Sequence, residues 1–77
     1  MYIAIRKESE NRTHAVYSFG TMEGTPRRIQ IEKSSGQVEL LDQAPGGEPD
    51  GVFLRAARKL EEHWAKGEYP LATCWAS

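Results

Sequence analysis

The chain contains few of the large aliphatic residues and phenylalanines that usually build a hydrophobic core. Ile, Leu, Val and Phe together make up 14 of its 77 residues, which is just below the usual fraction for a globular domain. Intrinsic disorder is nevertheless not expected, because the formal net charge of -1 is far from the high values typical of disordered chains. Aromatic residues must therefore supply much of the buried area: Tyr2, Tyr17, Phe19, Phe53, Trp64, Tyr69 and Trp75.

The chain also lacks a second cysteine, a long apolar run and a large excess of either charge. Its single cysteine, Cys74, cannot form an internal disulfide, so a reducing compartment is the expected environment. No stretch has the length and apolar character of a signal segment or a membrane span. The nearly balanced charge gives no general attraction to nucleic acid or to anionic membranes. We therefore expect a cytoplasmic protein that does not bind membranes.

What the chain does contain is a change of hydrophobic period. Alternating apolar and polar residues predict four strands, over residues 2–7, 13–19, 27–33 and 37–42. A spacing of three and four residues then predicts one helix over 52–66. Short polar turns between the strands favour an antiparallel meander. The predicted fold class is α+β, a single small domain over 1–77 with a four-stranded antiparallel β-meander and one C-terminal helix packed on one face.

The alternation also predicts which residues face the core. The isoleucine pairs of the first and third strands point inward. In residues 13–19 the pattern is ambiguous, because Val16 argues for one face and Tyr17 and Phe19 for the other; we favour Tyr17 and Phe19 inward. The expected core-facing side chains outside that strand are Ile3, Ile5, Ile29, Ile31, Phe53, Ala56, Ala57, Leu60 and Trp64.

Turn and cap residues separate these elements. The polar segment 8–12 predicts the first turn, and Ser34 to Gly36 predicts a short hairpin with glycine at a positive φ. Residues 44–49 predict a crossover loop within the domain. Either Asp50 caps the helix or Pro49 occupies its first turn, and Gly67 ends it.

The tail, residues 68–77, is too apolar for an ordinary frayed terminus. Because large side chains are scarce, leaving Leu71 and Trp75 in water would forgo a useful share of the burial. We expect the tail to be ordered, either as a short extra strand at the sheet edge or with Trp75 packed beside the helix. Pro70 limits pairing to the residues after it. The alternative is a binding segment that offers Trp75 to a partner.

No catalytic, metal-binding or nucleotide-binding motif stands out. The glycines at 46, 47 and 51 precede a helix, but Glu48 and Asp50 already place carboxylates there and no P-loop Lys-Ser or Lys-Thr follows. His14, His63 and Cys74 are the soft ligands of the chain, and none has ligand spacing. We expect no cofactor, no metal and no enzymatic activity; an enzyme using His63 and Cys74 would need a convergence that no sequence pattern indicates.

Two surfaces are candidates for binding. A basic cluster of Arg55, Arg58 and Lys59 on the helix, joined by Arg27 and Arg28, suits an acidic or phosphate partner, although Glu61 and Glu62 dilute its field. One helix covers only one side of the sheet, so the other face stays open. The open face is expected to carry Tyr2, Ala4, Arg6, His14, Val16, Ser18, Arg28, Gln30, Glu32 and Gln37.

These surfaces favour a non-enzymatic protein-interaction module that binds a protein partner or itself as a homodimer. Its contacts would come from the open sheet face, an edge strand or the C-terminal aromatic residues. Weak nucleic-acid binding through the local basic cluster is the alternative. The candidate binding residues are Tyr2, Arg6, Arg28, Arg55, Arg58, Lys59 and Trp75.

Overall fold

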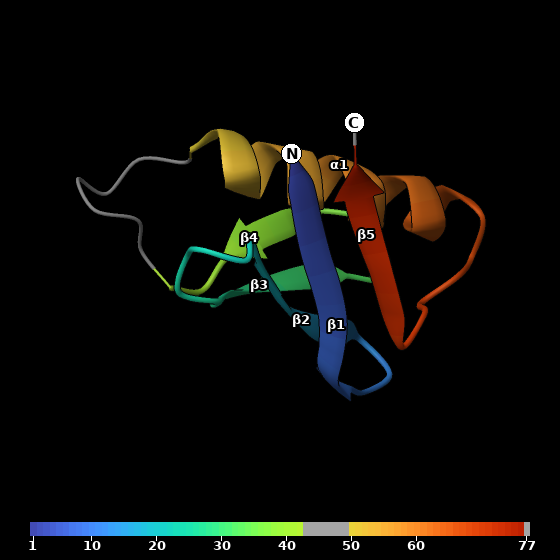
Figure 1. Ribbon diagram of the computed structural model, residues 1–77. Helices are drawn as coiled ribbons and strands as arrows, with labels where there is room; N and C mark the ends of the chain where they lie inside the picture. Colours follow the sequence, from blue (N-terminus) through green and yellow to red (C-terminus); the bar gives the residue numbers. More distant parts are fainter. Residues whose placement is uncertain (43–49, 77) are drawn as a thin grey trace.

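The computed structural model describes residues 1–42 and 50–76 (Figure 1). The predicted crossover loop 44–49, and with it Pro49, lies outside the described residues. The elements are β1 (Tyr2–Glu10), β2 (His14–Gly20), β3 (Arg27–Glu32), β4 (Val38–Leu40), α1 (Gly51–Ala65) and β5 (Ala72–Ala76).

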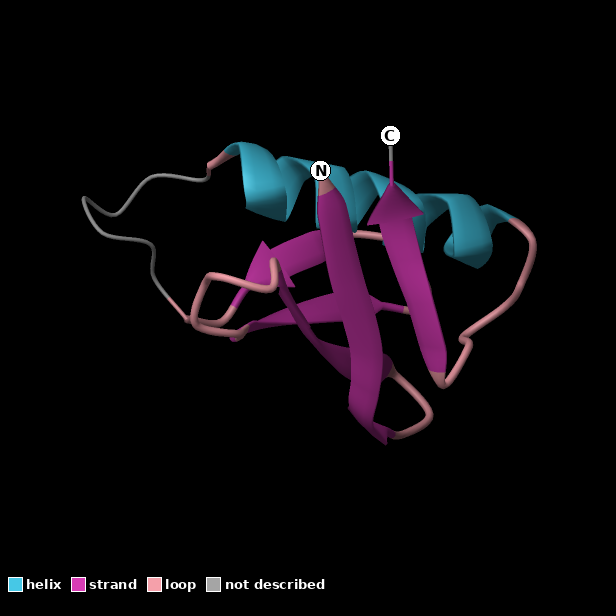
Figure 2. Cartoon of the chain, in the orientation of Figure 1, coloured by secondary structure: helices cyan, strands magenta, loops and turns pink. Residues whose placement is uncertain are grey.

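The five strands form one antiparallel sheet with the order β4-β3-β2-β1-β5. The four predicted strands are confirmed as a meander, and the apolar tail adds the fifth strand beside β1. Helix α1 packs on one face of the sheet, and β5 runs next to β1 (Figures 1 and 2). The α+β class is therefore confirmed.

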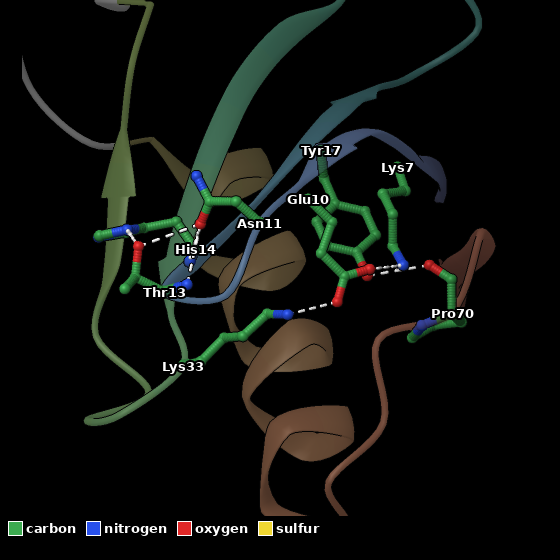
Figure 3. A network of polar contacts seen from close by, with 8 residues as sticks. All are labelled: Lys7, Glu10, Asn11, Thr13, His14, Tyr17, Lys33 and Pro70. Atoms are coloured by element: carbon green, nitrogen blue, oxygen red, sulfur yellow. Dashed lines mark hydrogen bonds and ion pairs between the residues drawn. The ribbon is translucent and has the colours of Figure 1, made fainter.

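The predicted bounds differ from the structure in every strand, by one residue at the ends of β2 and β3 and by more in β1 and β4. β1 continues to Glu10 instead of turning after Lys7, because main-chain pairing needs no apolar side chain where the strand reaches solvent. Its register shifts between Lys7 and Ser9, as in a β-bulge, which bends the strand. The chain turns instead at Asn11, whose side-chain oxygen accepts hydrogen bonds from the amides of Thr13 (2.9 Å) and His14 (2.8 Å) (Figure 3).

β4 is shorter than the predicted strand 37–42. Its residues Val38–Leu40 pair with β3, and the Leu41 amide still donates to the Arg28 carbonyl at 2.9 Å. At Asp42 the hydrogen bond to β3 is made by a side chain, whose carboxylate accepts from the Arg28 amide at 2.8 Å. A carboxylate that binds a main-chain amide in this way replaces the next main-chain bond of the ladder.

The core lies between the sheet and α1, and the predicted inward faces are confirmed. Tyr17 and Phe19 are inside, which settles the ambiguous face of the second strand. Phe19 and Phe53 bring sheet and helix together, with ring centroids 6.2 Å apart. The buried side chains are Ile3, Ile5, Ala15, Tyr17, Phe19, Ile29, Ile31, Phe53, Ala56, Ala57 and Leu60.

Trp64 closes the core where the β3–β4 turn meets the helix. Its indole N–H donates to the Lys33 carbonyl at 2.8 Å, so its polar atom is satisfied. The ring lies against Gly36, where a Cβ atom would come within 2.7 Å of it. Gly36 also has a φ of 77°, so the predicted glycine turn is confirmed and has two reasons to exclude a side chain.

The predicted cap and stop residues of the helix are confirmed, although the helix begins and ends one residue earlier than predicted. The Asp50 carboxylate accepts a hydrogen bond from the Phe53 amide at 2.9 Å, which satisfies one of the free donors of the first turn. Arg27 donates to both oxygens of the same carboxylate, and with the Phe53 amide it holds the pKa of Asp50 below its ordinary value. Gly67 has a φ of 73° just beyond the helix.

A polar network ties the segment before β5 to the sheet (Figure 3). The Tyr17 hydroxyl donates to the Pro70 carbonyl at 2.9 Å. Glu10 accepts hydrogen bonds from Lys7 and Lys33, and the Lys33 ammonium also lies 4.8 Å from the Tyr69 ring centroid. Burial, and next the charge of Glu10, raise the pKa of Tyr17 to about 12.

The raised pKa of Tyr17 predicts a loss of stability at alkaline pH. An unfolded tyrosine ionises near pH 10 and the folded one near 12, so this contribution is complete below pH 10 and is lost as the pH rises toward 12. Denaturant titrations across this range should show a smaller decline for Tyr17→Phe than for the parent. At neutral pH the variant should lose about 1 kcal/mol with the hydrogen bond to Pro70. Parallel alkaline declines in both proteins would contradict the assignment.

Candidate protein-interaction surface

The predicted binding residues do not form one site. Tyr2, Arg6 and Arg28 lie on the open face of the sheet, where Arg28 donates to Asp42 at 3.1 and 3.2 Å. This pairing raises the pKa of the Arg28 guanidinium and lowers that of the Asp42 carboxyl. The positive charge of Arg28 is therefore already balanced within the protein.

Arg27 points to the opposite face. Its guanidinium lies 5.0 Å from the Phe19 ring centroid and pairs with Asp50 at 2.8 Å. Consecutive side chains of a strand alternate between the two faces, so Arg27 and Arg28 cannot act together on one surface. The predicted cluster that joined both to the helix arginines is wrong for this reason.

The structure does bring Arg55, Arg58 and Trp75 together. With Gly51 and Leu54 they line a hollow of about 440 Å³. The Arg55 guanidinium lies 5.2 Å from the Trp75 ring centroid and donates to the Gly51 carbonyl at 3.0 Å. Lys59, which was predicted in the same cluster, lines a different hollow with His63 and neighbouring helix residues.

Trp75 satisfies both structural expectations for the tail. It belongs to an edge strand, and it stands opposite Ile3 on the helix-covered face of the sheet. Its ring is half-buried and packs against the core beside α1. The expectation for Leu71 is wrong: this residue lies just before β5 and is 78% exposed.

Among the described residues, the main chain of β5 pairs with another strand on one side only. The Lys7 amide donates to the Leu71 carbonyl at 2.8 Å, and β1 and β5 pair in register from there to Tyr2 and Ala76. Hydrogen-bonded and non-hydrogen-bonded pairs alternate in an antiparallel ladder, so Thr73 and Trp75 also bond to β1. The residues between them direct their N–H and C=O groups away from the sheet: Ala72, Cys74 and Ala76.

Within its own five residues, β5 carries none of the sequence features that usually protect an edge strand from pairing. The strand Ala72–Ala76 contains no charged residue, no proline and no register shift. In the part of the chain that is described, β1 is its single pairing strand. The opposite edge differs, because β4 has three residues and carries Glu39 at its centre. The β5 edge is therefore the better place for another strand.

The sequence patterns missed two features of this surface. One is the free main chain of β5, which depends on β5 pairing with β1 and has no signal in residue types. The other is Leu54, which is 58% exposed beside Arg55 and Arg58. Its signal was present, since Leu54 is the one leucine of the helix that falls outside the stripe ending on Trp64.

The soft ligands are spread over separate places. His63 reaches Thr73 on the helix-covered face of β5, with 3.0 Å between His63 Nε2 and the Thr73 hydroxyl. Cys74 lies on the other face of the same strand, and His14 begins β2 on that open face. Within residues 1–42 and 50–76, no three His, Cys, Asp or Glu side chains gather where they could hold a metal ion.

Comparison of the chain with protein-family models, with curated proteins and with solved structures gives no significant match. The helix of the described chain is not long and apolar enough to cross a membrane. What the surface can do must therefore be argued from its own geometry.

Proposed function

We propose that this protein is a non-enzymatic, cytoplasmic protein-interaction module that binds an extended protein segment along β5. The observation that carries the proposal is the outward-facing main chain of Ala72, Cys74 and Ala76, which pairs with no strand within residues 1–42 and 50–76. An extended segment placed there would continue the sheet beyond β5. Strand addition of this kind uses main-chain hydrogen bonds for affinity and alternate side chains for specificity.

The free edge offers enough hydrogen bonds for a moderate interaction. Each of its three outward residues carries one donor and one acceptor, and each bond contributes about 0.5 to 1.5 kcal/mol net. These three residues have small side chains, so they project little from the open face of the sheet next to Ala4. Leu71, Leu54 and Trp75 add apolar surface near the two ends of the strand.

The distribution of charge supports protein binding over nucleic-acid binding. Arg27 and Arg28 are paired with aspartates on opposite faces of the sheet. They therefore do not add their positive charge to that of the helix arginines, as binding of a phosphate backbone would require. The separation of His63 and Cys74 by the strand between them likewise supports a binding role over a nucleophilic one. The single cysteine fits a reducing compartment.

The proposal is tested by removing one outward N–H. Peptides that bind the parent protein are first selected from a random peptide library, and their dissociation constants are then measured. Cys74→Pro should weaken them about tenfold, the equivalent of one hydrogen bond. The fold should persist, because the lost N–H faces away from β1.

Cys74→Ala is the matched control, since it changes the same side chain and keeps the N–H; its affinities should stay within about twofold of the parent. Circular dichroism checks that both variants are folded. If the peptides bind Cys74→Pro as tightly as the parent, the β5 edge is not the binding site.

A further inference from the structure

We infer that the segment bound at β5 is acidic, with carboxylates that meet Arg55 and Arg58 on the helix side of the new strand. This inference rests on the proposed function and names the chemistry of its partner. It follows from which basic residues of the protein are already balanced and which are not.

Four basic residues in or next to the sheet form ion pairs within the protein. Lys7 and Lys33 share Glu10, Arg27 pairs with Asp50, and Arg28 pairs with Asp42. These pairings hold the pKa of each of the three carboxyls below its ordinary value. Carboxylates of the protein therefore already engage these four side chains.

The basic residues around β5 are different. Arg55 and Arg58 form no ion pair with any residue of the described chain, and neither does Arg6, which stands opposite Ala72 on the open face. Positive charge is therefore left over on both faces of the β5 edge. A partner strand with carboxylates supplies the complementary charge.

Of the two faces of the β5 edge, the helix-covered face has the arginine that is better held in place. Arg55 is held in place by its bond to the Gly51 carbonyl and by the ring of Trp75. Side chains of an added strand alternate between the faces, so every second one would stand on the same face as Trp75. The hollow beside that ring, lined by Leu54 and the two arginines, can receive a carboxylate on an apolar stem.

A second copy of this chain fits the same edge less well. Antiparallel pairing of two β5 strands would be symmetric and would place both copies of α1 on the same side. The helix arginines of one copy would then approach those of the other, without an unpaired carboxylate among the residues lining the hollow to offset them. Like charges brought together across an interface oppose association.

Three synthetic peptides of equal length test the inference. Each alternates Thr or Val with one variable residue, which is Glu in the first, Gln in the second and Lys in the third. They are titrated into isotopically labelled protein, with dissociation constants from NMR and hydrogen exchange at the amides of Ala72, Cys74 and Ala76. The Glu peptide should protect these amides and bind about five- to tenfold more tightly than the Gln peptide at low salt. The Lys peptide should bind most weakly, and the Glu preference should shrink as salt increases.

Two variants locate the effect. The double variant Arg55→Gln, Arg58→Gln should remove the preference for Glu while the Gln peptide still binds. Arg28→Gln is the matched control, because its charge lies on the open face and is paired with Asp42; it should keep the preference.

The possible failures are distinguishable. Equal binding of the Glu and Gln peptides, with protection of the three amides, overturns the acidic partner and leaves strand addition standing. If no peptide protects the amides, both the inference and the proposed function fail. Concentration-dependent protection without any peptide, accompanied by dimers in sedimentation, would identify a second copy as the occupant and overturn the inference.

Discussion

Deleting residues 71–77 is expected to abolish cooperative unfolding. The deletion removes β5, which pairs with β1 along five residues and places Thr73 and Trp75 on the helix-covered face. Ile5 and Ile3 stand directly opposite these two residues and would lose their neighbours on that side. In a protein of this size, which buries only about 60% of its unfolded surface, the loss of one half-buried tryptophan and one ladder is a large share of the stability.

Thermal unfolding followed by circular dichroism measures this effect. Leu71→Ser is the matched control: its side chain is 78% exposed, so its melting curve should coincide with that of the parent. If the deletion variant keeps an unchanged melting midpoint and loses only partner binding, the tail is a binding segment without a structural role.

Leu60→Ala is expected to cost about 2 to 5 kcal/mol of unfolding free energy. Leu60 is 2% exposed and lies in the stripe of α1 that packs on the sheet. Its truncation leaves a cavity in a core that has few other aliphatic residues to fill it. The variant is therefore best measured in a stabilising osmolyte, with the parent under the same conditions.

Denaturant titration gives the free energies. Leu54→Ala removes the same atoms from the exposed side of the same helix, where the side chain is 58% exposed, so it should change the stability by no more than about 0.5 kcal/mol. A Leu60→Ala variant as stable as Leu54→Ala would show that the helix docks through another face.

The faces of the strands and of the helix could be predicted because they depend on local period. Ile3 and Ile5, like Ile29 and Ile31, share a face at a spacing of two, and any antiparallel sheet with one covered side buries them together. The cap at Asp50 and the turn at Gly36 were equally local, since a carboxylate reaches the first-turn amides and glycine alone accepts a positive φ cheaply.

The candidate site could be predicted only in part. Arg55, Arg58 and Trp75 were recognised as unusual residues, but their contact depends on β5 lying beside β1 and under α1. Arg27 and Arg28 were grouped with them because they are adjacent in sequence. The partners that neutralise them, Asp50 and Asp42, lie 23 and 14 residues away and are brought close by folding.

By itself, therefore, the sequence determined the class of the fold, its buried faces and its helix ends, because periodicity and capping act over a few residues. The sequence offered an edge strand as one placement of the tail, but the tertiary structure alone decided that this strand pairs with β1, which arginines keep an unbalanced charge and which amides of β5 face away from the sheet. Those features arise from pairing between residues far apart in the chain. Local pattern does not encode such pairing, since the same short apolar strand satisfies its hydrogen bonds beside any open edge.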